Sequence, residues 1–149
     1  MIFQTSKYTR SILENLLNKL TPKQLYFIPK GFKNHILWNI AHILVTEQLL
    51  IYKLSGLDIN MDNKFVNLYG KGSTPKTKIS LTEIDEIKEQ LIPLIEKTEK
   101  DFKNGTFKNF IEYPTSTGIV LRSLDDTFKF NNYHEGIHLG IILSIKKLL

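Results

Sequence analysis

The sequence predicts an all-α protein, a four-helix bundle with a long crossover between its second and third helices. Four stretches of the 149 residues place apolar side chains at the three- and four-residue spacing of a helix. No stretch shows a convincing strand pattern, and there is no internal repeat. Residues 57–79, between the second and third stretches, are rich in turn-forming residues and long enough to traverse a bundle. We expect residues 1–149 to form a single domain.

The first two helices are marked by apolar spacing and by the residues at their ends. Residues 5–20 carry apolar side chains on one face, at Ile12, Leu13, Leu16, Leu17 and Leu20. Asn34 is the expected N-cap of the second helix, which spans residues 35–55 and stops at Gly56. The face of this helix that is predicted to point into the core carries Trp38, His42, Val45, Leu49 and Tyr52. The pattern therefore places a histidine, His42, at a core position.

The third and fourth helices open with capping sequences. Ser80 to Glu83 form a capping box before the third helix, which Pro93 should kink and Asn104-Gly105 should close. Residues 107–121 permit either a short hairpin or an ordered loop. The last helix starts near Ser123 and runs almost to the end of the chain. Its predicted core face carries Thr127, Asn131, His134, His138, Ile141, Ile145 and Leu148.

The composition narrows the chemistry that the chain can carry. There are no cysteines, which excludes disulfides, thiolate ligands and a cysteine nucleophile, so a transition-metal site has to use histidines and carboxylates. The net charge of +5 comes from lysines spread along the chain, so we expect no nucleic-acid partner. The longest apolar stretch, residues 36–54, is interrupted by polar side chains and predicts no membrane span. The N-terminus shows no signal-peptide pattern, and we expect a cytoplasmic protein.

Histidines from two predicted helices fall on faces that point into the same interior. His134 and His138 are four residues apart, so one helix face presents both rings, and the second helix adds His42. Three neutral imidazoles can converge on one divalent metal ion and leave a coordination position open, as catalytic sites do. The alternative is three packed core histidines, each satisfied by a hydrogen bond. His35, two helical turns before His42, is interpreted as a helix-start or surface residue.

The run from His134 to His138 also matches the H-E-x-x-H motif of zinc proteases. That class of protease needs a third ligand downstream, and the eleven residues after His138 contain no His, Asp or Glu. The protease interpretation is therefore rejected. Two candidate catalytic residues remain. Glu135 is a candidate base or supporting group, and Asn131, one turn before His134, could orient a ligand or a bound water, although it could also be a surface amide.

Two sequence elements resemble those of the DinB-like, or YfiT-like, superfamily. The run from Trp38 to Ile43 resembles its W-x-x-x-H element, and the run from His134 to Gly140 resembles its C-terminal H-E-x-x-H-x-G element. Further similarity lies in residues 20–29, 54–56 and 72–75, so that the resemblance covers nearly the whole chain. It implies a four-helix bundle that holds a divalent metal, zinc or nickel, through His42, His134 and His138.

The resemblance is less specific about the reaction, because one fold hosts many functions. Characterised relatives include S-transferases that use low-molecular-weight thiols such as bacillithiol or mycothiol, and a maleylpyruvate isomerase, and homodimers are common among them. The resemblance therefore implies a metal-dependent transferase or hydrolase that acts on a small electrophile, with a small-molecule thiol as partner, in a homodimer. The alternative is a non-catalytic metal-binding or dimerisation bundle, such as a stress-related scaffold.

Overall fold

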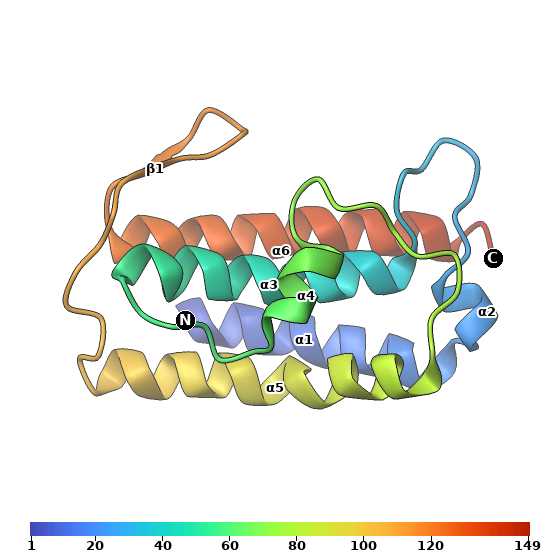
Figure 1. Cartoon of the computed structure of the whole chain (residues 1–149), viewed down its shortest axis with the longest axis horizontal. Coiled ribbons are helices and arrows are strands. Elements are labelled where there is room, and N and C mark those ends of the chain that lie inside the picture. The colour runs from blue at the N-terminus through green and yellow to red at the C-terminus, as the bar shows by residue number, and fades with distance from the viewer.

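Four long helices make up most of the computed structural model, which describes residues 1–149 (Figure 1). They are α1 (Ile2–Lys19), α3 (Ile36–Ile51), α5 (Leu81–Lys103) and α6 (Leu124–Lys146). The shorter elements are α2 (Pro22–Leu25), the 3-10 turn η1 (Lys53–Ser55), α4 (Asn63–Tyr69) and the strands β1 (Tyr113–Pro114) and β2 (Val120–Leu121). The predicted all-α class is confirmed. None of these helices combines the length and the apolar character needed to cross a bilayer.

Each long helix packs against two others along the long axis of the molecule. α3 contacts α6 and α5, and α1 contacts α5 and α6. The colours in Figure 1 show that α1 and α6 run in one direction and that α3 and α5 run in the other. Because α3 and α5 are parallel, the chain has to return along the molecule between them. Residues 57–79 make this return, as the sequence predicts for the crossover.

The apolar faces of these helices meet in one core of 20 buried residues. Complete burial of one such aliphatic side chain contributes roughly 1.5–3 kcal/mol, far more than the helix propensity of a single residue. The packing of the faces, rather than local propensity, therefore holds the helices together. Fully buried members of the core include Leu13, Ile36, Leu37, Ile40, Ile43, Ile87, Leu91, Ile142 and Ile145.

The helix ends agree with the predicted caps except at α3. The Ser80 hydroxyl accepts a hydrogen bond from the Glu83 amide, and the Ser123 hydroxyl accepts one from the Asp126 amide. At α3 the predicted N-cap, Asn34, is wrong by one position. His35 caps this helix instead, because its Nδ1 accepts a hydrogen bond of 2.9 Å from the Trp38 amide. His35 is also fully buried, so its interpretation as a surface residue is wrong and its interpretation as a helix-start residue is right.

The two connecting segments contain structure that the sequence left open. The crossover includes a short helix, α4, which was not predicted; the Asp62 side chain caps it by accepting a hydrogen bond from the Lys64 amide. Residues 107–121 contain the hairpin alternative, in which β1 and β2 pair with Tyr113 opposite Leu121. In Figure 1 this hairpin projects beside α6, at one end of the molecule.

The predicted core face of α6 is rotated relative to the observed one. The buried residues of this helix include Asn131, Glu135 and Ile142, whereas His134 and His138 are only half-buried. The prediction placed both histidines at core positions, whereas they are only partly buried. The physical reason is that a charged side chain, Glu135, occupies the central position because it has a buried ionic partner. The two histidines consequently lie at the edge of the core, where they can reach a cavity.

Candidate metal centre

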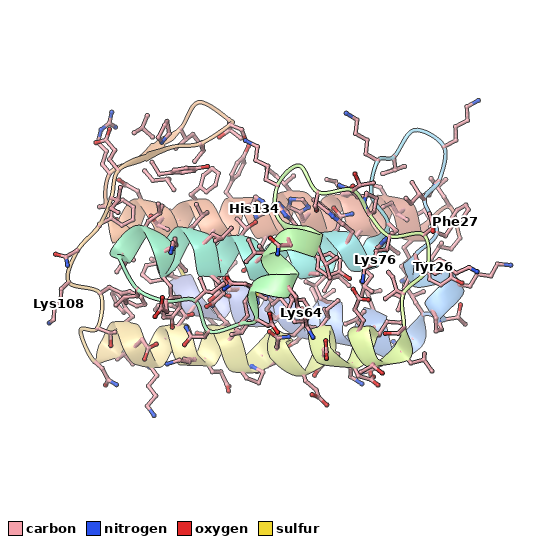
Figure 2. The ribbon with its side chains drawn as sticks, viewed as in Figure 1. Tyr26, Phe27, Lys64, Lys76, Lys108 and His134 are labelled. Atoms are coloured by element: carbon pink, nitrogen blue, oxygen red, sulfur yellow. The ribbon has the colours of Figure 1, made fainter.

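Three histidines from two helices meet at one point of the structure. His42 comes from α3, and His134 and His138 come from successive turns of α6. Each ring offers a nitrogen, and the three nitrogens all lie within 4.8 Å of one another. The ring centroids are 4.5 Å apart for His134 and His138, 4.8 Å for His42 and His138, and 5.2 Å for His42 and His134. Figure 2 labels His134 near the middle of α6.

The orientation of His42 is fixed by the crossover and by an aromatic neighbour. Its Nδ1 lies 2.6 Å from the main-chain carbonyl oxygen of Tyr69, the last residue of α4. A carbonyl only accepts, so Nδ1 carries the proton and Nε2 carries the lone pair. The Thr46 hydroxyl lies 3.3 Å from Nε2 and can donate to it. The imidazole also stacks on the Trp38 indole, with centroids 4.6 Å apart and planes 13° apart.

His138 is held by an amide whose own direction is fixed. Asn39 donates from Nδ2 to the main-chain carbonyl of His35, at 2.9 Å, so its Oδ1 is free to accept. This Oδ1 lies 2.8 Å from Nδ1 of His138, which must therefore carry the proton. Nε2 of His138 is left with the lone pair. A histidine that ligates a metal is commonly held in this way, by a hydrogen bond to its other nitrogen.

His134 differs from the other two histidines because no protein group forms a hydrogen bond with its Nδ1. Its Nδ1 is buried and has no hydrogen-bond partner in the protein. Its ring is flanked by Phe130, with centroids 6.3 Å apart. Buried polar atoms without a partner are rare and costly, and each calls for an explanation such as a bound ion. The packed-histidine alternative, in which every ring finds a hydrogen bond, does not account for this ring.

All three imidazoles are held in the neutral form. Burial, with a smaller contribution from the neighbouring histidines, lowers the pKa of His134 to about 3 and that of His138 to about 4. Burial also lowers the pKa of His42, against a smaller opposing effect of the hydrogen bond to Tyr69. A histidine binds a metal through the lone pair of its neutral ring. The three side chains are therefore ready to act as ligands near neutral pH.

The donor set fits a divalent transition metal. Three neutral imidazoles without thiolates or carboxylates suit zinc, nickel or copper better than calcium or magnesium, which prefer oxygen. Three protein ligands leave one tetrahedral position free, which is the pattern of a catalytic rather than a structural site. His35 does not belong to this set, because Nδ1 accepts from the Trp38 amide and Nε2 donates to the Lys76 carbonyl.

A cavity of about 490 Å³ opens beside the three histidines. One wall is formed by α3, with His42, Thr46, Leu49 and Leu50, and by the η1 turn after it, with Lys53 and Leu54. The opposite side is α6, with His134, Ile137 and His138. The hairpin supplies Tyr113, Thr115, Ser116 and Thr117, and the crossover supplies Lys71. The site is thus a pocket that is large enough for a small molecule.

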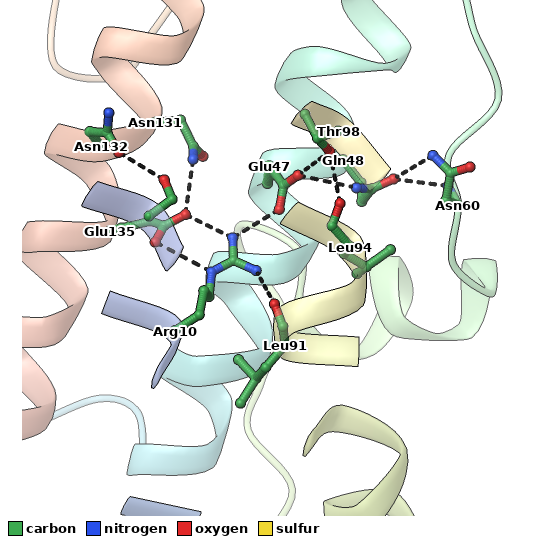
Figure 3. A network of polar contacts seen from close by, with 11 residues as sticks. Arg10, Glu47, Gln48, Asn60, Leu91, Leu94, Thr98, Asn131, Asn132 and Glu135 are labelled. Carbon is green, nitrogen blue, oxygen red and sulfur yellow. Dashed lines mark hydrogen bonds and ion pairs between the residues drawn. The ribbon is translucent and has the colours of Figure 1, made fainter. Parts of the chain in front are cut away.

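The two predicted catalytic residues face away from this pocket. Glu135 is 1% exposed, and its carboxylate accepts from Arg10 at 2.7 and 3.3 Å and from Nδ2 of Asn131 at 2.9 Å (Figure 3). Neither Glu135 nor Asn131 lines the cavity. The structure therefore brings the two together, on the core side of α6, but does not bring them to the open side of the histidine group. Their direct part in a reaction stays a prediction.

Sequence reasoning missed the centre of that network, Arg10. This guanidinium is completely buried and joins three helices: it donates to Glu135 of α6 at 2.7 Å, to Glu47 of α3 at 2.9 Å and to the Leu91 carbonyl of α5 at 3.3 Å. Burial alone would lower the pKa of Arg10, but the two carboxylates raise it above its usual value. Thr98 completes the network by donating to Glu47.

A signal for this network exists in the sequence. Arg10 lies three residues before Leu13 and seven before Leu17, which puts a charge on the apolar face of α1. Glu47 lies four residues after Ile43 and four before Ile51, on an apolar face of α3. Charged residues at core positions of two helices predict a buried ion pair, because an isolated buried charge is too unfavourable to persist.

Comparison with known proteins agrees with this geometry. A family model described as the DinB superfamily matches residues 7–142, a region that contains all three histidines, Asn39 and Tyr69. No curated protein matches the chain. The match covers most of the sequence and includes both elements on which the resemblance rests. The chain belongs to the DinB superfamily.

Proposed function

We propose that this protein is a metal-dependent enzyme, a thiol S-transferase or a hydrolase that acts on a small electrophile at the three-histidine site. The observation that carries the proposal is the convergence of His42, His134 and His138 beside a pocket of about 490 Å³. Membership of the DinB superfamily supports a role that depends on a metal. Zinc and nickel are the proposed metals, and a low-molecular-weight thiol is the proposed cosubstrate.

The chemistry divides between the metal and the chain. A divalent ion bound at such a site supplies a Lewis acid, which lowers the pKa of a thiol or a water molecule at its open position. The three imidazoles would hold the ion, and Tyr69 and Asn39 keep two of them in the correct tautomer. The apolar walls of the pocket keep the reacting groups partly shielded from water. We assign Glu135 and Asn131 a positioning role, because Glu135 accepts from Arg10 of α1 and Asn131 donates to the same carboxylate.

The proposal also includes the larger assembly. We propose that α1, α3, α5 and α6 form the four-helix bundle of the family as a single domain, with the hairpin and crossover covering the site. We further propose that the protein is a cytoplasmic homodimer. Sedimentation velocity of the purified protein measures the second point: a dimer at micromolar concentration supports it, and a monomer at all concentrations contradicts it.

The reaction is tested by turnover of the metal-loaded protein. The protein, reconstituted with zinc or with nickel, is incubated with a panel of low-molecular-weight thiols and monochlorobimane, and the fluorescent thioether is measured. We expect thiol-dependent turnover above the uncatalysed rate, lost in His138→Ala and unchanged in Lys19→Gln, which alters an exposed residue of α1 outside the pocket. Hydrolysis of activated esters that needs no thiol would favour the hydrolase.

The alternative, a non-catalytic bundle, is favoured if the protein binds metal but catalyses no reaction. If the protein binds its metal but shows no turnover over a broad range of thiols, electrophiles and esters, the enzymatic proposal is contradicted. The non-catalytic metal-binding or dimerisation bundle is then the better description.

A further inference from the structure

The pocket beside the histidines contains positive charge and no negative charge. Of its 14 lining residues, two are lysines, Lys53 and Lys71, and none is an aspartate or a glutamate. A histidine side chain is neutral or cationic and never anionic, so nothing in the lining balances the two lysines. A divalent metal among them would add two further positive charges. The pocket is therefore strongly suited to a ligand that carries negative charge.

The two pocket lysines are not engaged in ion pairs with the protein's own carboxylates. Neither Lys53 nor Lys71 has a carboxylate within 4.0 Å. Six other lysines do form such ion pairs with Asp or Glu, at Lys7, Lys64, Lys76, Lys97, Lys103 and Lys129. The ammonium groups at the pocket are consequently available to a ligand, without a protein ion pair that has to be broken first.

The lysines reach the pocket from two different elements. Lys71 follows Tyr69 by two residues, and the Tyr69 carbonyl is bonded to His42, so the crossover brings Lys71 close to the histidine group. Lys53 lies in η1, just beyond the end of α3, eleven residues or, at the rise of an α-helix, roughly 16 Å from His42. Lysine side chains are long and flexible, so both can reach inward over part of this distance.

The walls between these charges are suited to a compact organic molecule. Leu49, Leu50, Leu54 and Ile137 offer apolar surface, and the hairpin adds the hydroxyl groups of Thr115, Ser116 and Thr117. Small-molecule sites commonly combine an apolar lining with a few polar groups that fix the orientation of the ligand. Hydroxyl groups can donate hydrogen bonds to an anionic oxygen without adding charge.

We propose that Lys53 and Lys71 form an anion subsite, so that the substrate or thiol of this pocket carries a carboxylate or phosphate group in addition to the atom that faces the histidines. This inference rests on the proposed function, because it takes the histidine group as the metal end of the same site. It adds a specificity: a neutral ligand of the same size binds more weakly. Lys53 and Lys71 are specificity-determining residues here and take no part in bond making or breaking.

Matched thiols test the subsite by a spectroscopic readout that does not need turnover. The protein is loaded with Co²⁺, whose visible spectrum changes when a thiol enters its coordination sphere, and is titrated with 3-mercaptopropionate, 3-mercaptopropionamide and 2-mercaptoethylphosphonate. We expect at least one of the two anionic thiols to bind about fivefold more tightly than the neutral amide, with a preference that weakens as salt is added. The tighter of the two anions identifies carboxylate or phosphate as the preferred group.

The lysine variants assign the preference to its residues. The ratio of the affinity for the anionic thiol to that for the amide should fall toward one in Lys53→Gln and in Lys71→Gln, and most of all in the double variant. The affinity for the amide should stay unchanged. Lys19→Gln removes an exposed lysine outside the pocket and should retain the full preference. Equal affinity for the amide and both anions, or a preference that survives in the double variant, overturns the subsite and leaves the metal site intact. A cobalt spectrum that no thiol changes contradicts the thiol-transferase form of the proposed function, and the subsite falls with it.

Discussion

Asn39 shows how a single side chain prepares the histidine group for a metal. Its amide donates to the His35 carbonyl and accepts from His138, so it fixes both the direction and the tautomer of that imidazole. Replacement of such a supporting group typically weakens metal binding by about 10- to 100-fold. We expect Asn39→Leu to show a loss of this size and Asn39→Asp, which keeps an acceptor, to bind metal much more tightly than Asn39→Leu.

The measurement for Asn39 is a competition titration of zinc against a fluorescent chelator. Asn18→Leu is the matched control, because Asn18 is exposed on α1 and contacts none of the three histidines. Zinc affinity of Asn39→Leu equal to that of Asn18→Leu would show that the amide has no part in holding His138.

His35 gives a prediction about pH. Burial lowers its pKa to about 4, against smaller opposing effects of Lys76 and Glu83, whereas an unfolded histidine has a pKa near 6.5. Between these values the unfolded chain binds a proton that the folded protein excludes. The contribution of His35 to stability is therefore complete above about pH 6.5 and is lost as the pH falls toward 4.

We expect the free energy of unfolding of the metal-free protein to fall over this range, and to fall less steeply in His35→Asn. Asparagine can still cap α3 but does not titrate. Urea denaturation at a series of pH values measures both slopes. Parallel curves for the two proteins would contradict the assignment of this pH dependence to His35.

At the scale of residues, the sequence predicts which three histidines come together but not the groups that hold them in place. The spacing of His134 and His138, together with His42 on a second helix, was sufficient to select these three histidines. The partner of His42 is the main-chain carbonyl of Tyr69, and a carbonyl leaves no signature in a sequence. The partner of Glu135 was not predicted for a related reason, since Arg10 lies at the other end of the chain.

At the scale of elements, Arg10 joins α1 to the two helices that carry the histidines. Glu47 follows His42 by five residues on α3, and Glu135 is adjacent to His134 on α6. Both carboxylates accept from the same Nη2 atom of Arg10, at 2.9 and 2.7 Å. The network therefore fixes the spacing of α3 and α6 (Figure 3).

Removal of this guanidinium should destabilise the fold strongly. We expect Arg10→Met to lower the free energy of unfolding by about 3–5 kcal/mol, because it leaves two buried carboxylates without their partner. The only other arginine, Arg122, is exposed, and Arg122→Met should stay within about 0.5 kcal/mol of the wild type. Chemical denaturation measures the free energy of unfolding of both variants. A similarly small decrease in the two would contradict a structural role of the network.

The path of the crossover could be predicted from the sequence, but its secondary structure could not. Its length and turn content predicted that it crosses the molecule, and it does. The seven-residue helix α4 was not predicted, since a helix this short is not stable from its own sequence. Contacts with α3 stabilise the crossover instead: Tyr69 binds His42, Ser73 accepts from the Trp38 indole, and Lys76 accepts from His35.

At the scale of the whole molecule, the histidine group links distant parts of the chain. His42 and the His134–His138 pair become neighbours only when α3 and α6 pack together, so the complete site exists in the folded state alone. A ligand that binds only the folded state stabilises it, by about 2.7 kcal/mol at a free concentration one hundred times its dissociation constant.

Metal should therefore raise the midpoint of thermal unfolding. We expect the increase in wild-type protein with zinc or nickel, measured by circular dichroism against a chelator-treated sample, and little change in His42→Ala. An equal increase in both proteins would place the stabilising metal elsewhere on the chain.

The central claim, that His42, His134 and His138 together hold one metal ion, is tested most directly by elemental analysis of purified, metal-reconstituted protein. We predict one divalent transition-metal ion per chain in the wild type, a loss of most of it in each of His42→Ala, His134→Ala and His138→Ala, and full retention in His35→Asn. His35 is the one remaining histidine of the chain, and both of its ring nitrogens are engaged elsewhere. Substoichiometric metal in the wild type, or metal that survives all three alanine substitutions, would contradict the account.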